Sequence, residues 1–166
     1  MSVSRRLFLA ALGVAGVAGG SLARAGDLPQ PLVAFDDELK NGFQNWSWAK
    51  TQLSVPAGNG KAIRVEGDPW SALVLHHDAF STEGYTKLTF VINGGKDGGQ
   101  TLMIKAMADG KAIDADFAIQ LKAKTWAVVE VPLKDINAAG KTIDTLIWQG
   151  QAAAYPGYYI TRIQLE

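Results

Sequence analysis

The sequence predicts an all-β protein, a two-sheet antiparallel jelly-roll sandwich of about ten strands. From Leu32 onward, short apolar runs with period-two alternation follow one another. Clusters of glycine, proline, asparagine and aspartate separate these runs. No window keeps a helical period, and only Leu133–Ala139 could form a single helical turn. A barrel is the alternative that the same strand spacing allows.

The expected strands share this alternation and are bounded by turn residues. They are Leu32–Asp36, Gln44–Leu53, Lys61–Glu66, Ser71–His77, Lys87–Asn93, Gln100–Ala108, Asp114–Leu121, Thr125–Pro132, Thr142–Gln149 and Tyr158–Leu165. The expected breaks fall at Asn41-Gly42, Pro56–Gly60, Gly67–Pro69, Gly94–Gly99, Asp109-Gly110 and Pro156-Gly157.

Residues 1–25 read as an export signal rather than as part of the fold. Ser4–Leu9 matches the bacterial twin-arginine pattern, and Ala23–Ala25 supplies a small-x-small cleavage site. A membrane-anchoring helix is the alternative, but the apolar run Ala10–Leu22 is glycine-rich and shorter than the roughly 20 residues that span a bilayer. We therefore expect a domain over 26–166 in the periplasm or outside the cell.

The composition of that domain limits its partners. Cleavage removes Arg5, Arg6 and Arg24, so that 16 basic and 16 acidic residues become 13 and 16, a net charge of −3. This balance argues against nucleic acid and anionic membranes as partners. The chain has no cysteine, so core packing alone must hold the domain together.

The outward faces of the expected strands are mixed in character. Leu73 and Leu75 form the better core pair of Ser71–His77, and Leu102, Ile104 and Ala106 form that of Gln100–Ala108. The side chains left outside are Val74, His76, Val91, Asn93, Met103, Lys105 and Met107. Such a face suits either a shallow ligand groove or a cover formed by a loop or the N-terminal segment.

Tryptophans provide the best functional signal. Trp46 and Trp48 lie two residues apart in one expected strand, so both belong to the core or both form an aromatic platform. If both were buried, Trp70 at a strand entrance and Trp148 would be the remaining platform. Trp126 reads as structural.

Aromatic faces stack on the C–H-rich faces of pyranose rings, while amide, histidine and lysine side chains bond sugar hydroxyls. Gln149 follows Trp148 directly and supplies such an amide.

No catalytic or zinc motif accompanies these residues. His76 and His77 are neighbours in a strand, so they point to opposite faces and cannot easily share one ion. Each histidine has either a structural, hydrogen-bonded role or a ligand contact. Asp36, Asp37 and Glu38 offer oxygens for a structural calcium, although turn chemistry explains them equally well.

Four segments together resemble the galactose-binding-like β-jelly-roll carbohydrate-binding modules of secreted bacterial polysaccharide-degrading proteins. These segments are Asp36–Trp48, Trp70–His77, Tyr85–Gly95 and Trp126–Leu133. The resemblance implies a two-sheet sandwich with a ligand groove on one sheet or at the loop tips, often with a structural calcium. Thr161-Arg162 stands where such modules frequently carry acidic residues, which argues against the calcium.

The sequence thus predicts an exported, non-catalytic domain that binds a poly- or oligosaccharide without a cofactor. The expected contact residues are Trp48, Trp70, His76, Lys105, Trp148 and Gln149. Two alternatives remain: a small glycan lyase or hydrolase that uses His76 or His77 with a carboxylate, and an envelope module that binds another protein.

Overall fold

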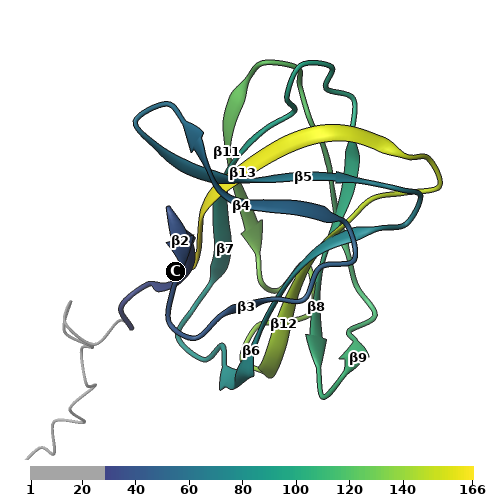
Figure 1. The fold of residues 1–166 in the computed structure, drawn as a ribbon. Coiled ribbons are helices and arrows are strands. Elements are labelled where there is room, and N and C mark those ends of the chain that lie inside the picture. Colours follow the sequence, from purple (N-terminus) through teal and green to yellow (C-terminus); the bar gives the residue numbers. More distant parts are fainter. Residues whose placement is uncertain (1–28) are drawn as a thin grey trace, which may run out of the picture.

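The computed structural model describes residues 29–166 as two antiparallel β-sheets packed face to face (Figure 1). Thirteen strands and no helix occur in this range, which confirms the all-β sandwich. Consequently, no helix long and apolar enough for a membrane is found between residues 29 and 166. The expected export signal, residues 1–25, lies outside the described residues.

Sheet A is organised around the long strand β13, which curves across the molecule (yellow in Figure 1). One side of β13 pairs with β7, and β7 pairs with the edge strand β11. The other side is shared: β5 pairs with the first half of β13, and β1 pairs with the second half. The strands of sheet A are β1 (Leu32–Asp36), β2 (Glu38–Leu39), β4 (Lys50–Ala57), β5 (Gly60–Gly67), β7 (Lys87–Asn93), β11 (Trp126–Pro132) and β13 (Tyr155–Leu165).

Sheet B has the strand order β10-β8-β12-β6-β3, with β9 paired to β8. Its strands are β3 (Gln44–Asn45), β6 (Ala72–Ser81), β8 (Thr101–Ala108), β9 (Lys111–Ala112), β10 (Phe117–Gln120) and β12 (Thr142–Gln149). Its central strands, β6, β8 and β12, are long and contribute one buried face each.

The core lies between the sheets and follows the predicted alternation. Leu73 and Leu75 from β6, with Leu102 and Ile104 from β8, are all fully buried in one cluster. Phe90 and its neighbours on β7 close the cluster from sheet A. Each such side chain contributes about 1.5–3 kcal/mol through burial, which is why the alternation fixes the register of both sheets.

Several expected elements differ in the structure. The break expected at Pro156-Gly157 lies inside β13, which begins at Tyr155, and the strand expected to end at His77 continues as β6 to Ser81. The strand expected over Gln44–Leu53 is divided, because the chain leaves sheet B after β3 and joins sheet A at β4. The strand expected over Asp114–Leu121 is only Phe117–Gln120. Leu133–Ala139 forms turns, closed by a 2.8 Å bond from the Ala138 N–H to the Leu133 carbonyl.

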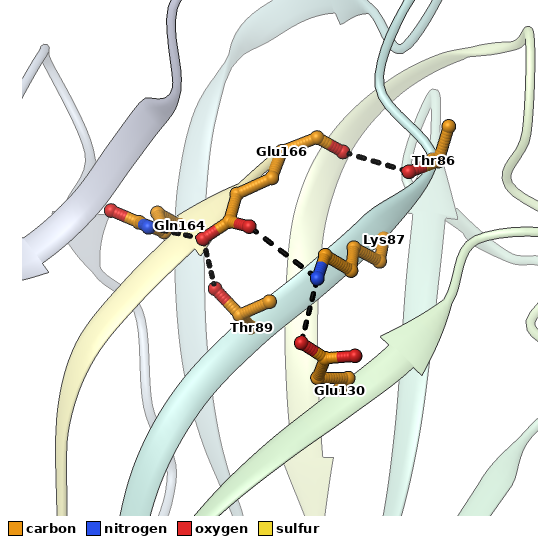
Figure 2. Close-up of polar contacts among 6 residues, drawn as sticks. All are labelled: Thr86, Lys87, Thr89, Glu130, Gln164 and Glu166. Carbon is orange, nitrogen blue, oxygen red and sulfur yellow. Dashed lines mark hydrogen bonds and ion pairs between the residues drawn. The ribbon is translucent and has the colours of Figure 1, made fainter.

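The end of β13 is fastened to its neighbours by a polar network centred on Glu166 (Figure 2). The Glu166 carboxylate accepts hydrogen bonds from Gln164 and from the Thr89 hydroxyl (3.0 Å). Lys87 lies between two acids, 2.6 Å from Glu130 and 3.6 Å from Glu166. These contacts join β13, β7 and β11 on the outer face of sheet A.

Candidate functional site

The outer face of sheet B has an apolar floor separate from the main core. Ala72 and Val74 of β6 and Ile147 of β12 form a small buried cluster, with Met107 of β8 packed against it. The alternate residues of the same strands, such as Leu73 and Leu146, belong to the main core. The floor therefore lies on the side of the sheet that faces away from sheet A.

Polar side chains surround this floor in a fixed register. In the middle row, Lys105 lies opposite Ile147, which lies opposite Val74. In the row on one side, Gln149 lies opposite both Met103 and Ala72. In the row on the other side, Thr145 lies opposite both Met107 and His76.

Residues 46–49 follow the free edge of β6 without forming a regular strand. The Trp46 N–H donates to the Val74 carbonyl (3.0 Å), and the Ala49 N–H donates to the Ala72 carbonyl (3.0 Å). Between them, the Ser47 hydroxyl accepts the Val74 N–H at 2.9 Å. These bonds hold the two tryptophans at the border of the floor.

Both of these tryptophans are exposed, which decides between core and platform. Trp46 is 56% exposed and Trp48 is 57% exposed, as is Trp70. The prediction that Trp46 and Trp48 share one environment is confirmed, although no continuous strand contains them. We call the outward side chains of β6, β8 and β12, together with Trp46, Trp48 and Trp70, the sheet B platform.

Four of the six predicted contact residues form one hydrogen-bonded chain on the platform. The Trp48 indole N–H donates to the Trp70 carbonyl (3.1 Å), and the Gln149 amide donates to the same oxygen (3.0 Å). Lys105 Nζ donates in turn to Gln149 Oε1 at 3.2 Å. This series of hydrogen bonds fixes the orientation of the Trp48 indole. The remaining N–H donors of Lys105 are available to a ligand.

The loop before β6 holds Trp70 in a left-handed backbone conformation, with φ of 63°. The Trp70 N–H donates to the Gln151 carbonyl (2.8 Å), and the Ser71 hydroxyl donates to the Asp68 carbonyl (2.7 Å). A non-glycine residue in this region costs about 1–2 kcal/mol. Residues in such conformations cluster at ligand-binding and active sites.

His76 is the fifth predicted contact residue, and it supports Trp46. Their rings are stacked, with centroids 3.6 Å apart and an interplanar angle of 16°. The Thr145 hydroxyl donates to Asp144 Oδ1 (2.7 Å), so its oxygen must accept the bond from His76 Nδ1 (3.0 Å). In neutral His76 the proton is therefore on Nδ1, and Nε2 is a free acceptor with no partner among residues 29–166.

The prediction for Trp148 is wrong. Trp148 is fully buried in the main core and packs edge-to-face on Phe90, with centroids 5.5 Å apart. The parity of β12 explains this, because Ile147 and Gln149 face outward and the residue between them must face inward. The assignment of Trp126 as structural is also wrong, since its side chain is 45% exposed on sheet A.

His77 has a structural environment instead. Its Nε2 lies 2.7 Å from the Asn41 carbonyl, and its ring packs on Phe43 and Phe80. Within residues 29–166, neither histidine is hydrogen-bonded to a carboxylate. No group of three or more metal-ligating side chains is found in the same range.

Sequence reasoning missed part of the platform. The sequence does not decide whether Trp46 belongs to the core or to the platform. Its spacing of two residues from Trp48 indicates only that both have the same position. Thr145 and Asp144, which orient His76, gave no signal because their role depends on the register of β12 against β6. Asp68, which lines a hollow of about 250 Å³ beside Trp48, likewise gave no signal, whereas Tyr155 of the same hollow belongs to the excess of aromatic residues that the sequence shows.

Comparison with solved structures shows what this architecture resembles. A mutant of a family 29 carbohydrate-binding module superimposes with a TM-score of 0.63 at 14% identity, over 83% of this chain and 92% of that chain. The chain has the fold of family 29 carbohydrate-binding modules, a β-jelly roll. A second mutant, complexed with mannohexaose, has a TM-score of 0.63 and 14% identity over 82% of this chain and 90% of that chain. A third, complexed with cellulohexaose, has a TM-score of 0.61 and 15% identity over 82% and 89%.

Sequence comparison also gives a relative. An endoglucanase of Dictyostelium discoideum is 25% identical over 146 residues, which are 81% of this chain. The chain spans only 21% of that enzyme, so it matches a part of it. No protein-family model matches the chain.

Proposed function

We propose that this protein is a non-catalytic carbohydrate-binding domain that holds a neutral hexose chain on the sheet B platform. The observation that carries the proposal is the grouping of three exposed tryptophans, Trp46, Trp48 and Trp70, beside an apolar floor with polar groups at its borders. The C–H-rich faces of sugar rings stack on indoles, and the hydroxyls around the rings form hydrogen bonds with polar side chains. The platform offers both kinds of contact.

The polar groups of the platform complement the sugar hydroxyls in both directions. Lys105 and the amide of Gln149 are donors, and His76 Nε2 is an acceptor. Among these groups Lys105 alone carries a fixed charge and its partner is the neutral amide of Gln149, so hydroxyls are the matching ligand groups for most of the platform. The family 29 modules complexed with mannohexaose and cellulohexaose support the same ligand class.

The test is isothermal titration of the protein with cellohexaose and mannohexaose. Trp48→Ala and Trp70→Ala should each weaken binding about tenfold, because each removes one stacked ring. Trp126→Ala is the matched control, since it removes an exposed tryptophan from the other sheet. If the protein binds neither hexasaccharide, or if the control weakens binding as much as Trp48→Ala, the proposal is wrong.

The non-catalytic part of the proposal has its own test. The same oligosaccharides are incubated with the protein, and new reducing ends or unsaturated products are measured. Turnover that disappears in His76→Ala would show that the enzyme alternative is correct. His76 supports Trp46 by stacking and bonds to Thr145, which are positioning roles, and this favours binding over turnover.

The place of action is part of the same proposal. The twin-arginine motif, Ser4–Leu9, supports export, and a glycan-binding domain fits a periplasmic or secreted location. Fractionation of expressing cells should recover a protein that begins at Gly26, and Arg5→Lys with Arg6→Lys should retain the uncleaved form in the cytoplasm.

A further inference from the structure

The outer face of sheet A carries a second exposed tryptophan site, far from the platform in the fold. Trp126 is 45% exposed and Val128 is 73% exposed on the edge strand β11. Val131 on the same strand is fully buried, and Val129 packs against the core, so Trp126 and Val128 face outward. Trp126 lies opposite Asn93, which lies opposite Tyr159, so the indole begins a row across the sheet.

Trp126 lines two hollows. The larger has a volume of about 520 Å³ and lies where β13 changes partner from β5 to β1. Arg162 marks this change with a φ of 50°, and its side chain lines the hollow together with that of Lys61. The smaller, of about 300 Å³, is lined by Tyr159, Lys96 and Lys124. A sugar ring stacked on Trp126 would therefore have a hollow on either side, each with room for a neighbouring sugar unit.

Backbone contacts place the two lysines of the smaller hollow together. The Lys124 N–H donates to the Gly95 carbonyl at 2.7 Å, which joins the loop before β11 to the loop after β7. Gly95 has a φ of 68°, and a Cβ there would lie 2.1 Å from the Gly157 carbonyl oxygen. Only glycine allows this approach, so the position of Lys96 is set by the fold.

The two hollows beside Trp126 differ in charge. The larger is lined by Asp36 and Asp37 as well as by Lys61 and Arg162, so its acids and cations balance. Lys96 and Lys124 of the smaller hollow form no salt bridge with any acid in residues 29–166. The smaller hollow has two lysines and no acid in its lining.

We propose that Trp126 is the centre of a second carbohydrate-binding surface, which takes an acidic glycan built of uronic acid units. One sugar stacks on Trp126, and the carboxylate of its neighbour lies in the smaller hollow beside Lys96 and Lys124. A further unit of the glycan can lie over the larger hollow, where acids and cations balance. The Trp126 surface on sheet A thus binds acidic glycans, whereas the sheet B platform binds neutral ones.

The experiment is an NMR titration of the protein with hexagalacturonate, beside a parallel titration with cellohexaose. Hexagalacturonate should shift the Trp126 indole and the amides around Lys96 and Lys124. Trp126→Ala should weaken its binding about tenfold, and Trp48→Ala should not change it. Raising NaCl from about 50 to 500 mM should weaken binding of the acidic chain several-fold, because ion pairs at the surface are screened.

The double variant Lys96→Gln with Lys124→Gln keeps the tryptophan and tests the charge separately. It should weaken hexagalacturonate binding and reduce the salt dependence. Absence of binding, or shifts confined to Trp48 and Trp70, would overturn the proposal. Failure of cellohexaose to bind would count against the sheet B platform alone, because the two probes report on different faces.

Discussion

At the scale of single residues, the five tryptophans divide into four exposed side chains and one buried side chain. Trp46, Trp48, Trp70 and Trp126 are exposed, while Trp148 is fully buried. A sugar can reach only the first group, and the last holds the sheets together through its contact with Phe90. Tryptophan thus has two roles in this protein, which depend on whether its side chain faces solvent or the core.

Trp148→Ala should therefore lower the free energy of unfolding strongly. Removing a fully buried indole leaves a cavity, which typically costs about 3–5 kcal/mol. Trp48→Ala should cost about 1 kcal/mol or less, because its ring is mostly in solvent. Urea denaturation of both variants measures the difference, and equal losses would contradict the buried position of Trp148.

The hydroxyl of Thr145 is the second residue-scale feature with a clear consequence. It fixes the proton of His76 on Nδ1 and so leaves Nε2 as an acceptor. Thr145→Val should weaken binding of a neutral hexasaccharide several-fold, whereas Thr145→Ser should keep it. Calorimetry gives the affinities, and ¹⁵N shifts of His76 report the tautomer. An unchanged tautomer in Thr145→Val would show that the hydroxyl does not set it.

At the scale of elements, the loop before β6 holds Trp70 exposed in a strained backbone conformation. Both Trp70→Ala and Trp70→Gly remove the ring, but only glycine relieves the left-handed conformation at φ 63°. We expect Trp70→Gly to be more stable than Trp70→Ala by about 1 kcal/mol. Thermal unfolding of the two variants tests this order, and equal or reversed stabilities would mean that the loop relaxes.

The elements also show how far the sequence could predict the site. Period-two alternation placed Leu73, Leu75 and Lys105 on their correct faces, because burial of one face enforces it. Applied to β12, the same rule would have buried Trp148 once Ile147 and Gln149 faced outward. The parity of Trp148 therefore predicts its position better than its residue type does.

Other parts of the site were beyond prediction because they depend on pairing between distant strands. The bond between His76 and Thr145 joins β6 to β12, and the sequence does not specify which strands are neighbours. The division of the strand expected over Gln44–Leu53 has a similar cause. The chain crosses between the sheets there, and Ser47 replaces a regular strand bond to β6 with its side chain.

At the scale of the whole molecule, the two outer faces of the sandwich have different chemistry. Sheet B presents an apolar floor bordered by Trp46, Trp48 and Trp70. Sheet A presents Trp126 beside a hollow lined by Lys96 and Lys124 and by no acid. Because the fully buried core lies between them, each face can vary without disturbing the other, and the binding tests above can be done on one protein.

Stability of the whole fold should decrease in acid, partly through Glu166. Hydrogen bonds from Gln164 and then Thr89, with the charge of Lys87, lower the pKa of the Glu166 carboxyl below its ordinary value (Figure 2). The pKa of Glu66 is lowered by Arg64 in the same way. A carboxyl whose pKa is lower in the folded state stabilises the fold above its unfolded pKa, about 4.3, and this contribution is lost as the pH falls through the folded value.

Glu166→Gln tests this argument because it keeps the shape of the side chain and removes the titration. The variant should be less stable than the wild type near pH 7, since the amide contacts Lys87 without a charge. The difference between the two proteins should shrink as the pH falls from about 5 to 3, because the wild type alone loses the contribution of Glu166. Urea denaturation at a series of pH values gives both curves, and curves that stay parallel through this range would show that the carboxylate does not fasten β13 to β7.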